Sequence, residues 1–371
     1  MTLRERILAV YRGHTPDVVP YMLDLSHWFY HKHAIPWDLS TVHNEPETGL
    51  LAYHREAGAG FYLPQLPSFY DVHYPGDVTA SALKSPDGSA ITWTIETPLG
   101  TIARTRRWEP QNYAWGIVNW PLESERDLDI LRYALSRRTY TPHWERYHEW
   151  ARAVGDDGVI YVPTGYSAMG HLLNYWMGVQ GAIYATFDMH DAVRVFVDAV
   201  NANLLDCVDL LAESPAEIII MGDNFSSDIQ PPAFFEEWSR PYYAEAIARL
   251  HRAGKCVAVH IDGRLRGALG MFRDIGADCA DAVTPSQPGD LAPRDCRDEA
   301  GPAMILSGGV PPQLWLPEID AAVFDTAVLA WLDLRHTSPR LIANAGDQVP
   351  PGADESRIHR MRELIEEYGR Y

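Results

Sequence analysis

A histidine and an aspartate two residues apart are the sharpest chemical feature of the sequence. His260 and Asp262 close the apolar run VAVHID. Residues i and i+2 of a strand point to the same face, so both side chains can reach one point. An imidazole and a carboxylate at this spacing suit a divalent metal such as zinc or iron. They equally suit a general base that its neighbour holds in one tautomer, and the sequence leaves both interpretations open.

Carboxylates also end other apolar runs. Asp24, Asp223 and Asp347 each follow or close such a run. If the runs are parallel strands of a barrel, their C-terminal ends converge on one pocket. Together with His260 and Asp262, these carboxylates would repel one another unless a cation or shared protons neutralised them. Each aspartate could instead cap the following helix, so a purely structural role stays open for any one of them.

Short apolar runs alternate with helical segments along most of the chain. The runs lack strict alternation, which suits strands buried on both faces of a parallel sheet. Alternation with helices implies right-handed βαβ units, and eight runs predict a closed (β/α)₈ TIM barrel of the α/β class. An open doubly wound sheet is the competitor, but no GxGxxG opens the first helix. The runs are Val18–Leu25, Gly60–Leu66, Val159–Gly165, Glu217–Asp223, Cys256–Asp262, Cys279–Pro285, Met304–Gly309 and Leu341–Gly346.

Five segments between or after these runs show helical periodicity. They are Asp191–Leu211, Phe234–Arg252, Arg264–Ile275, Ala321–Leu334 and Ser356–Tyr368.

One stretch breaks the alternation. Ile91–Trp108 is typical of an antiparallel β-hairpin that turns at Pro98-Leu99-Gly100. It lies between the second and third predicted strands, so we expect an insertion covering about residues 70–125. Such excursions often cover active sites. The whole chain, residues 1–371, is predicted to be a single domain.

Composition narrows the classes of partner. The formal charge is −19, from 50 acidic and 31 basic residues. This surface repels phosphate backbones and anionic lipids, so nucleic acid and membrane are excluded as expected partners. The four cysteines show no CxxC spacing, which indicates isolated thiols in a reducing compartment. The N-terminal segment lacks the features of a signal peptide, and we expect a cytoplasmic protein.

Three long segments carry a resemblance to a known enzyme group. RERILAVYRGHTPDVVPYM is similar to an opening helix that leads into a first strand. MGDNFSSDIQPPAFFEEWSRPYYAEAIARLHRAGKCVAVHIDG is similar to a strand–loop–helix–strand centre, and NAGDQVPPGADESRIHRMRELIEEYG to a closing turn and helix. Together they resemble the uroporphyrinogen decarboxylase and corrinoid-dependent methyltransferase superfamily over nearly the whole chain. The resemblance implies a barrel enzyme, often homodimeric, that acts on a small molecule.

The resemblance argues against a true uroporphyrinogen decarboxylase. Those enzymes hold porphyrinogen carboxylates with arginines after the first strand, where this chain has Leu23 and His27. A bidentate guanidinium clamp is therefore missing. Asn174 stands where the decarboxylases carry a tyrosine.

The methyltransferase branch of the superfamily often binds zinc through His-x-Cys and a later Gly-Cys. His260 matches the histidine, but Asp262 and Asp347 replace the two cysteines. Carboxylates in place of thiolates would shift the preference among metals. Other methyltransferases of the superfamily act on methoxy or methylamine donors without these cysteines.

The leading hypothesis is therefore a group-transfer enzyme, a methyltransferase acting with a corrinoid protein or a small methylated substrate. His260, Asp262 and Asp347 would bind a divalent metal, zinc first, or form an acid–base centre. Asp223 would join them in the catalytic set. The substrate-binding candidates are Asp24, His27, Asn174, Tyr175 and Asn224.

Two alternatives stay open. A cofactor-free decarboxylase or lyase of a non-porphyrin acid would use His260 or Asp347 to manage the proton. A non-catalytic ligand-binding barrel would explain the loss of both cysteines as decay.

Overall fold

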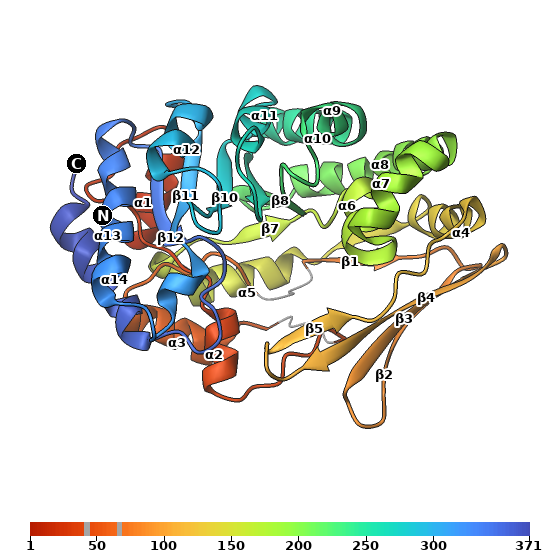
Figure 1. The fold of residues 1–371 in the computed structure, drawn as a ribbon, viewed down its shortest axis with the longest axis horizontal. Helices are drawn as coiled ribbons and strands as arrows, with labels where there is room; N and C mark the ends of the chain where they lie inside the picture. Colours follow the sequence, from red (N-terminus) through yellow and green to blue (C-terminus); the bar gives the residue numbers. More distant parts are fainter. Residues whose placement is uncertain (41–44, 65–68) are drawn as a thin grey trace.

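The centre of the fold is a parallel sheet of six strands (Figure 1). The computed structural model describes residues 1–40, 45–64 and 69–371. Each strand of the sheet pairs in parallel with the next one in the chain, which confirms the predicted α/β class. The strands are β7 (Tyr161–Pro163), β8 (Ile218–Phe225), β9 (Cys256–Ile261), β10 (Cys279–Val283), β11 (Ile305–Val310) and β12 (Leu341–Ala345).

Two N-terminal segments continue the backbone pairing beyond both edges of this sheet. Tyr21 forms a parallel bridge to β12, and Met22 forms one to Gly60. Phe61 then forms a parallel bridge to Gly158, shortly before β7. Parallel pairings therefore run from β12 through both segments to the start of β7. The segments coincide with the first two predicted runs, except that residues 65–66 lie outside the described residues.

Helices follow the parallel strands as the periodicity predicts. The predicted helix at 264–275 is shorter than expected because α11 begins only after Gly267, whose φ is 86°. None of the helices in the described ranges is long and apolar enough to cross a membrane. The helices are α1 (Leu3–Tyr11), α2 (Ser26–Lys32), α3 (Thr48–Ala57), α4 (Glu125–Leu135), α5 (Trp144–Val154), α6 (Ala168–His171), α7 (Gly178–Asp188), α8 (His190–Ala212), α9 (Pro232–Phe234), α10 (Arg240–Arg252), α11 (Ala268–Asp274), α12 (Pro293–Ala300), α13 (Ala321–Asp333) and α14 (Glu355–Tyr368).

A separate antiparallel sheet lies beside the parallel one, at the lower right of Figure 1. Its strands are β2 (Thr79–Lys84), β3 (Ala90–Thr97), β4 (Gly100–Glu109) and β5 (Ala114–Ile117), in that order. β3 and β4 form the hairpin that the sequence indicates, and Thr97 pairs with Gly100 at its turn. The outer strand β2 was not predicted, because all of its residues are exposed and it has no buried face to create a pattern. A short pair, β1 (Tyr70–His73) with β6 (Thr139–Pro142), flanks this region.

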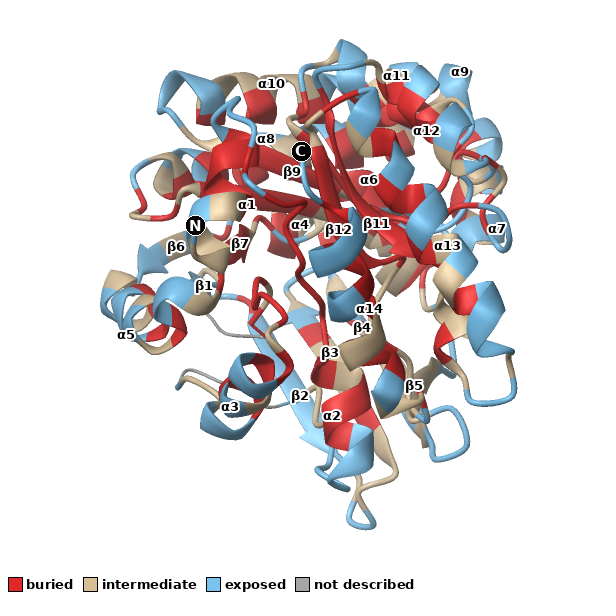
Figure 2. Cartoon of the chain, turned by 90° about the vertical axis from the view of Figure 1, so that its left-hand side faces the viewer, coloured by how far each residue is buried: buried red, intermediate tan, exposed pale blue. Residues whose placement is uncertain are grey.

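The core is concentrated on the parallel strands, as the red ribbon of Figure 2 shows. Every residue of β10, β11 and β12 is buried. One apolar cluster fills the space between strands and helices. A second, smaller cluster gathers strand residues such as Ile218, Ala258 and Ile342, and α1 packs against it with Ile7 and Val10. Strands buried on both faces explain the uninterrupted apolar runs of the sequence.

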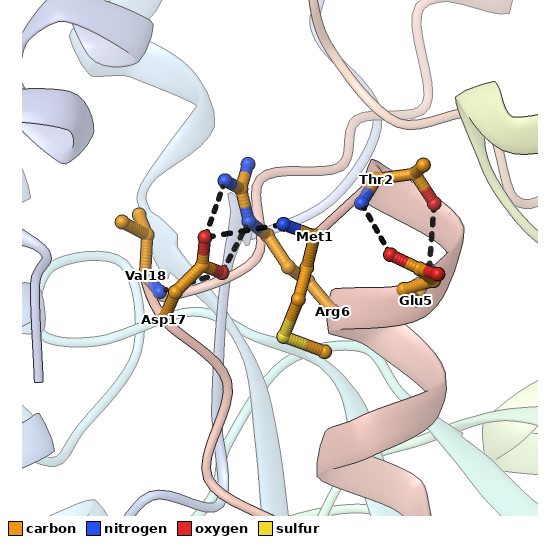
Figure 3. A network of polar contacts seen from close by, with 6 residues as sticks. All are labelled: Met1, Thr2, Glu5, Arg6, Asp17 and Val18. Atoms are coloured by element: carbon orange, nitrogen blue, oxygen red, sulfur yellow. Dashed lines mark hydrogen bonds and ion pairs between the residues drawn. The ribbon is translucent and has the colours of Figure 1, made fainter.

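Helix α1 is held in place at its N-terminus by a small polar network (Figure 3). The Thr2 hydroxyl accepts a hydrogen bond from the Glu5 backbone N–H, and the Glu5 carboxylate accepts one from the Thr2 N–H at 2.8 Å. Arg6 donates two hydrogen bonds to Asp17, at 2.7 and 2.9 Å. The Arg6 guanidinium holds the pKa of the Asp17 carboxyl well below its usual range. This pairing joins α1 to the chain that leads into the sheet at Val18.

The contact between Phe61 and Gly158 supplies a test of the pairing between the second N-terminal segment and β7. A methyl group at Gly158 would overlap the Phe61 carbonyl oxygen. We expect Gly158→Ala to lower the free energy of unfolding by about 1–3 kcal/mol, because overpacking forces the backbone apart. Urea denaturation measures the change, with Gly76→Ala as control, since a methyl group there meets nothing within 4 Å. Equal stability of the two variants would contradict the pairing.

Candidate active site

A cavity of about 370 Å³ opens where the parallel strands end. The C-terminal ends of β8, β9 and β10 form part of its walls. The residues that follow β7 and β12 and the ends of the two N-terminal segments form the rest. Five of the nine predicted site residues line it, which are Asp24, Asn224, His260, Asp262 and Asp347. Among the residues that the structure describes, four carboxylates, counting Asp281, and no lysine or arginine line the cavity.

The orientation of His260 is fixed by its neighbour on β10. The parallel register places His260 directly beside Asp281. The His260 Nδ1 lies 3.0 Å from the Asp281 backbone carbonyl oxygen. A carbonyl oxygen can only accept, so Nδ1 carries the proton and donates it. The other ring nitrogen, Nε2, has no hydrogen-bond partner among the described residues and is the atom that His260 can present to a ligand in the cavity.

Asp347, which follows β12, has the properties of an acid. Burial raises the pKa of its carboxyl to about 6, against the opposing effect of His260, and the charges of Asp262 and Asp24 raise it further. A carboxyl with this pKa is about half protonated near pH 6, so it can hold and release a proton in weakly acidic conditions. His260 and Asp347 thus bring a proton acceptor and a proton donor to the same cavity.

Asp281 is a site residue that the sequence analysis missed. It is 2% exposed and lines the cavity from β10. Burial raises the pKa of its carboxyl to about 6, although hydrogen bonding to Ser307 and the nearby His260 act in the opposite direction. Asn344 donates to Asp281 at 3.4 Å and to the Ser307 hydroxyl at 3.2 Å. Its signal in the sequence is an aspartate in the middle of the apolar run CADAV, away from the end of the run where the other carboxylates lie.

Asp24 combines a structural role with its place in the cavity wall. It is 4% exposed and accepts a hydrogen bond from the Ser26 backbone N–H at 3.0 Å. Gln348 donates a second hydrogen bond to it at 2.9 Å. Asp24 therefore fixes the turn into α2 and also lines the cavity, and its part in substrate binding stays a prediction.

Asp223 does not line the cavity, contrary to its predicted place in the catalytic set. On β8 the cavity-lining residues are Ile220, Gly222 and Asn224, and Asp223 has the opposite parity along the strand. Its carboxylate accepts a hydrogen bond from the Ser167 N–H at 2.7 Å and another from the Ser167 hydroxyl. Asp223 thus anchors the first residue of the turn that begins α6.

Three predicted substrate-binding residues also lie outside this cavity. The His27 Nε2 is 2.8 Å from the Tyr113 carbonyl oxygen and is engaged there. The Asn174 amide donates to the backbone carbonyl of Asp223 at 2.9 Å, which supports the end of β8. Tyr175 lines a second cavity, described below.

The predicted metal ligands share the cavity without forming a ready metal centre. Within residues 1–40, 45–64 and 69–371, no group of three or more histidine, cysteine, aspartate or glutamate side chains is arranged to hold a metal ion. His260, Asp262 and Asp347 therefore do not fit zinc as they stand. The four cysteines are free, and none lines the cavity.

The comparison with protein-family models decides the family. The model described as uroporphyrinogen decarboxylase (URO-D) matches residues 171–368, more than half of the chain. The chain belongs to the uroporphyrinogen decarboxylase family. The matched part of this uroporphyrinogen decarboxylase family member contains His260, Asp281 and Asp347, and it excludes the antiparallel sheet β2–β5.

Solved structures support the same fold for the whole chain. A methyltransferase from Methanosarcina mazei superposes with a TM-score of 0.68 at 14% identity, covering 99% of both chains. D-psicose 3-epimerase from Clostridium cellulolyticum H10, with D-tagatose, gives a TM-score of 0.35 at 11% identity, over 61% of this chain and 83% of that one. The latter value is too low to support an argument. No curated protein sequence matches the chain.

The buried Asp281 carboxyl predicts a specific pH dependence of stability. An aspartate in the unfolded chain titrates near 4, whereas the folded carboxyl titrates near 6. The folded state therefore loses stability, relative to the unfolded state, as the pH rises from about 4 to 6. We expect Asp281→Asn to remove this loss, so that the variant gains on the order of 2 kcal/mol relative to the parent protein between pH 4 and 7.

Urea denaturation at a series of pH values measures the effect. Asp206→Asn, at an exposed position of α8, is the matched control. Parallel stability curves for Asp281→Asn and the parent protein would contradict a raised pKa.

Proposed function

We propose that this protein is a methyltransferase that moves a methyl group between a small methylated donor and a corrinoid carried by a partner protein. The observation that carries the proposal is the pairing, in one cavity, of the free His260 Nε2 with the Asp347 carboxyl of raised pKa. The family and the fold similarity to a methyltransferase are consistent with this reaction type.

Methyl transfer from an oxygen or nitrogen donor needs an acid. The bond between the methyl carbon and the heteroatom breaks, and the new bond uses the electron pair of the acceptor. The electrons of the broken bond stay on the heteroatom, which becomes a better leaving group if it receives a proton. Asp347 supplies that proton, and His260 Nε2 accepts a hydrogen bond that orients the donor. The corrinoid, when bound, supplies the methyl acceptor.

A true uroporphyrinogen decarboxylase activity is not part of the proposal. The cavity walls contain four carboxylates and no lysine or arginine among the described residues. Such walls repel the multiple carboxylates of a porphyrinogen. Leu23 is buried, and His27 is engaged by the Tyr113 carbonyl, so neither replaces the missing arginines.

A decarboxylase or lyase of a different acid is the second candidate. The observation in its favour is that the acid–base pair is complete without a metal-ligand cluster in the described residues. Here Asp347 or His260 would deliver the proton to the carbon that loses carbon dioxide. Carbon dioxide release from a candidate acid without added corrinoid separates this reaction from methyl transfer.

We also infer the closed architecture and its setting. Parallel bridges from β12 through both N-terminal segments to Gly158 support a closed (β/α)₈ barrel, with β2–β5 as an insertion between its second and third strands. A single domain, a cytoplasmic location and a homodimer stay predictions.

Loss of either member of the acid–base pair should strongly lower the rate of catalysis. We expect His260→Gln and Asp347→Asn each to lower kcat for methyl transfer by roughly 100-fold or more, the usual contribution of a positioned acid or base. Cob(I)alamin with methoxy and methylamine donors provides a spectroscopic assay. His251→Gln, in the exposed last turn of α10, should retain full activity. Unchanged kcat in both site variants would exclude the proposed centre.

Divalent metal binding at His260, Asp262 and Asp347 stays a prediction with its own test. Zinc, where bound, would be held by these three side chains and would supply a Lewis acid. We expect chelator-treated protein to keep its activity and its melting temperature. Stoichiometric zinc in the purified protein, together with loss of activity on chelation, would favour the metal centre over the acid–base form.

A further inference from the structure

A second cavity, of about 330 Å³, adjoins the first. Gly165 and Tyr166, which follow β7, line both cavities. Its other walls come from β2, β3 and β4 of the antiparallel sheet and from the chain around α4, β6, α6 and α8. Aromatic rings dominate these walls, including Trp93 and Tyr175.

Two arginines face this cavity without an acidic partner. Arg138 is only 9% exposed, and its Nε donates to the Leu135 carbonyl at 3.0 Å. Its Nη2 is buried and has no hydrogen-bond partner among the described residues. Arg104 lies 4.4 Å from the centres of the Trp93 and Tyr175 rings, and its Nε is likewise buried without a hydrogen-bond partner in the described part of the chain.

Within the described ranges, no aspartate or glutamate lines the second cavity, and neither arginine forms an ion pair. The Asp223 carboxylate contributes to the raised pKa of Tyr166, but it already accepts a hydrogen bond from Ser167. Arg106, the next inward residue of β4, adds a third positive charge close to Arg104. Buried or half-buried cations without counter-charges are unfavourable, so these walls favour an anionic group.

The pKa of His171 also reflects the positive charge of these walls. It lines the cavity, and its Nδ1 is buried without a hydrogen-bond partner among the described residues. Burial lowers the pKa of its imidazole to about 3, and Arg138 and Arg104 lower it further. The ring is therefore neutral at physiological pH and adds no further positive charge to these walls.

We propose that the second cavity binds the carboxylate of a single-ring aromatic acid. Arg104 and Arg138 hold the carboxylate with charge-assisted hydrogen bonds, and the aromatic walls pack on the ring. The far end of the ligand then lies at Tyr166, which is also the wall of the cavity that contains His260. Assigning this ligand as the substrate, a methoxylated aromatic acid, rests on the proposed function. The binding site itself does not.

Titration calorimetry on the full chain with benzoate as probe tests the binding site. We expect benzoate to bind in the millimolar range or tighter, and benzamide, its neutral analogue, to bind at least ten-fold more weakly. Arg104→Met and Arg138→Met should each weaken benzoate binding by roughly ten- to a hundred-fold, the usual contribution of a hydrogen bond to a charged group. Arg107→Met and Arg137→Met, at exposed neighbouring positions, are matched controls and should bind as the parent protein does.

Three results would overturn the proposal: no benzoate binding, equal binding of benzamide, or binding of inorganic phosphate in place of benzoate. If a methionine variant fails to fold, Arg104→Lys and Arg138→Lys keep the charge but lose the planar fork, and weakened binding is again expected. The His260→Gln variant separates the two proposals. It should still bind benzoate, and inactivity of the parent protein on 4-methoxybenzoate with intact benzoate binding would remove only the methyl-transfer assignment.

Discussion

The hydrogen bond from the His260 imidazole to the Asp281 carbonyl is the interaction on which the candidate site depends. It needs β9 and β10 in parallel register, with the two residues side by side. It also uses a backbone acceptor, which cannot change its protonation state. Nδ1 of the histidine is therefore held as a donor, which leaves Nε2 as the nitrogen directed to other partners.

Burial gives the surrounding carboxyl groups their chemistry. Asp281 and Asp347 both have raised pKa values because each sits where water is excluded and other negative charges are near. Hydrogen bonds among Asp281, Ser307 and Asn344 satisfy the buried polar groups of this region without introducing a positive charge. The result is a cavity in which two carboxyl groups have raised pKa values.

The two adjoining cavities have opposite electrostatic character. In the described part of the chain, one is lined by carboxylates with a histidine and no lysine or arginine, and the other by two arginines and no acidic side chain. Tyr166 stands between them. A ligand with an anionic end is attracted to one cavity and repelled by the other, so charge alone would orient it. The antiparallel sheet contributes to this arrangement, because Arg104 of β4 lines the second cavity.

Much of the fold follows from the sequence. All eight apolar runs correspond to paired segments, apart from residues 65–66, which lie outside the described ranges. The hairpin of β3 and β4 lies where its turn residues predict it. Apolar runs and turn residues are local signals, and burial on both faces makes them strong. The exposed strand β2 left no such signal.

The sequence also determined that His260, Asp262, Asp347, Asp24 and Asn224 come together, because parallel strands end at one rim. Only the tertiary structure decided that Asp223 faces away from the cavity. Which alternate residues of a strand face the cavity depends on the elements that pack against its two faces. Only the tertiary structure revealed Asp281 and the unpaired Arg104 and Arg138. Whether a buried charge has a partner depends on side chains from distant segments, and no spacing along the chain encodes that.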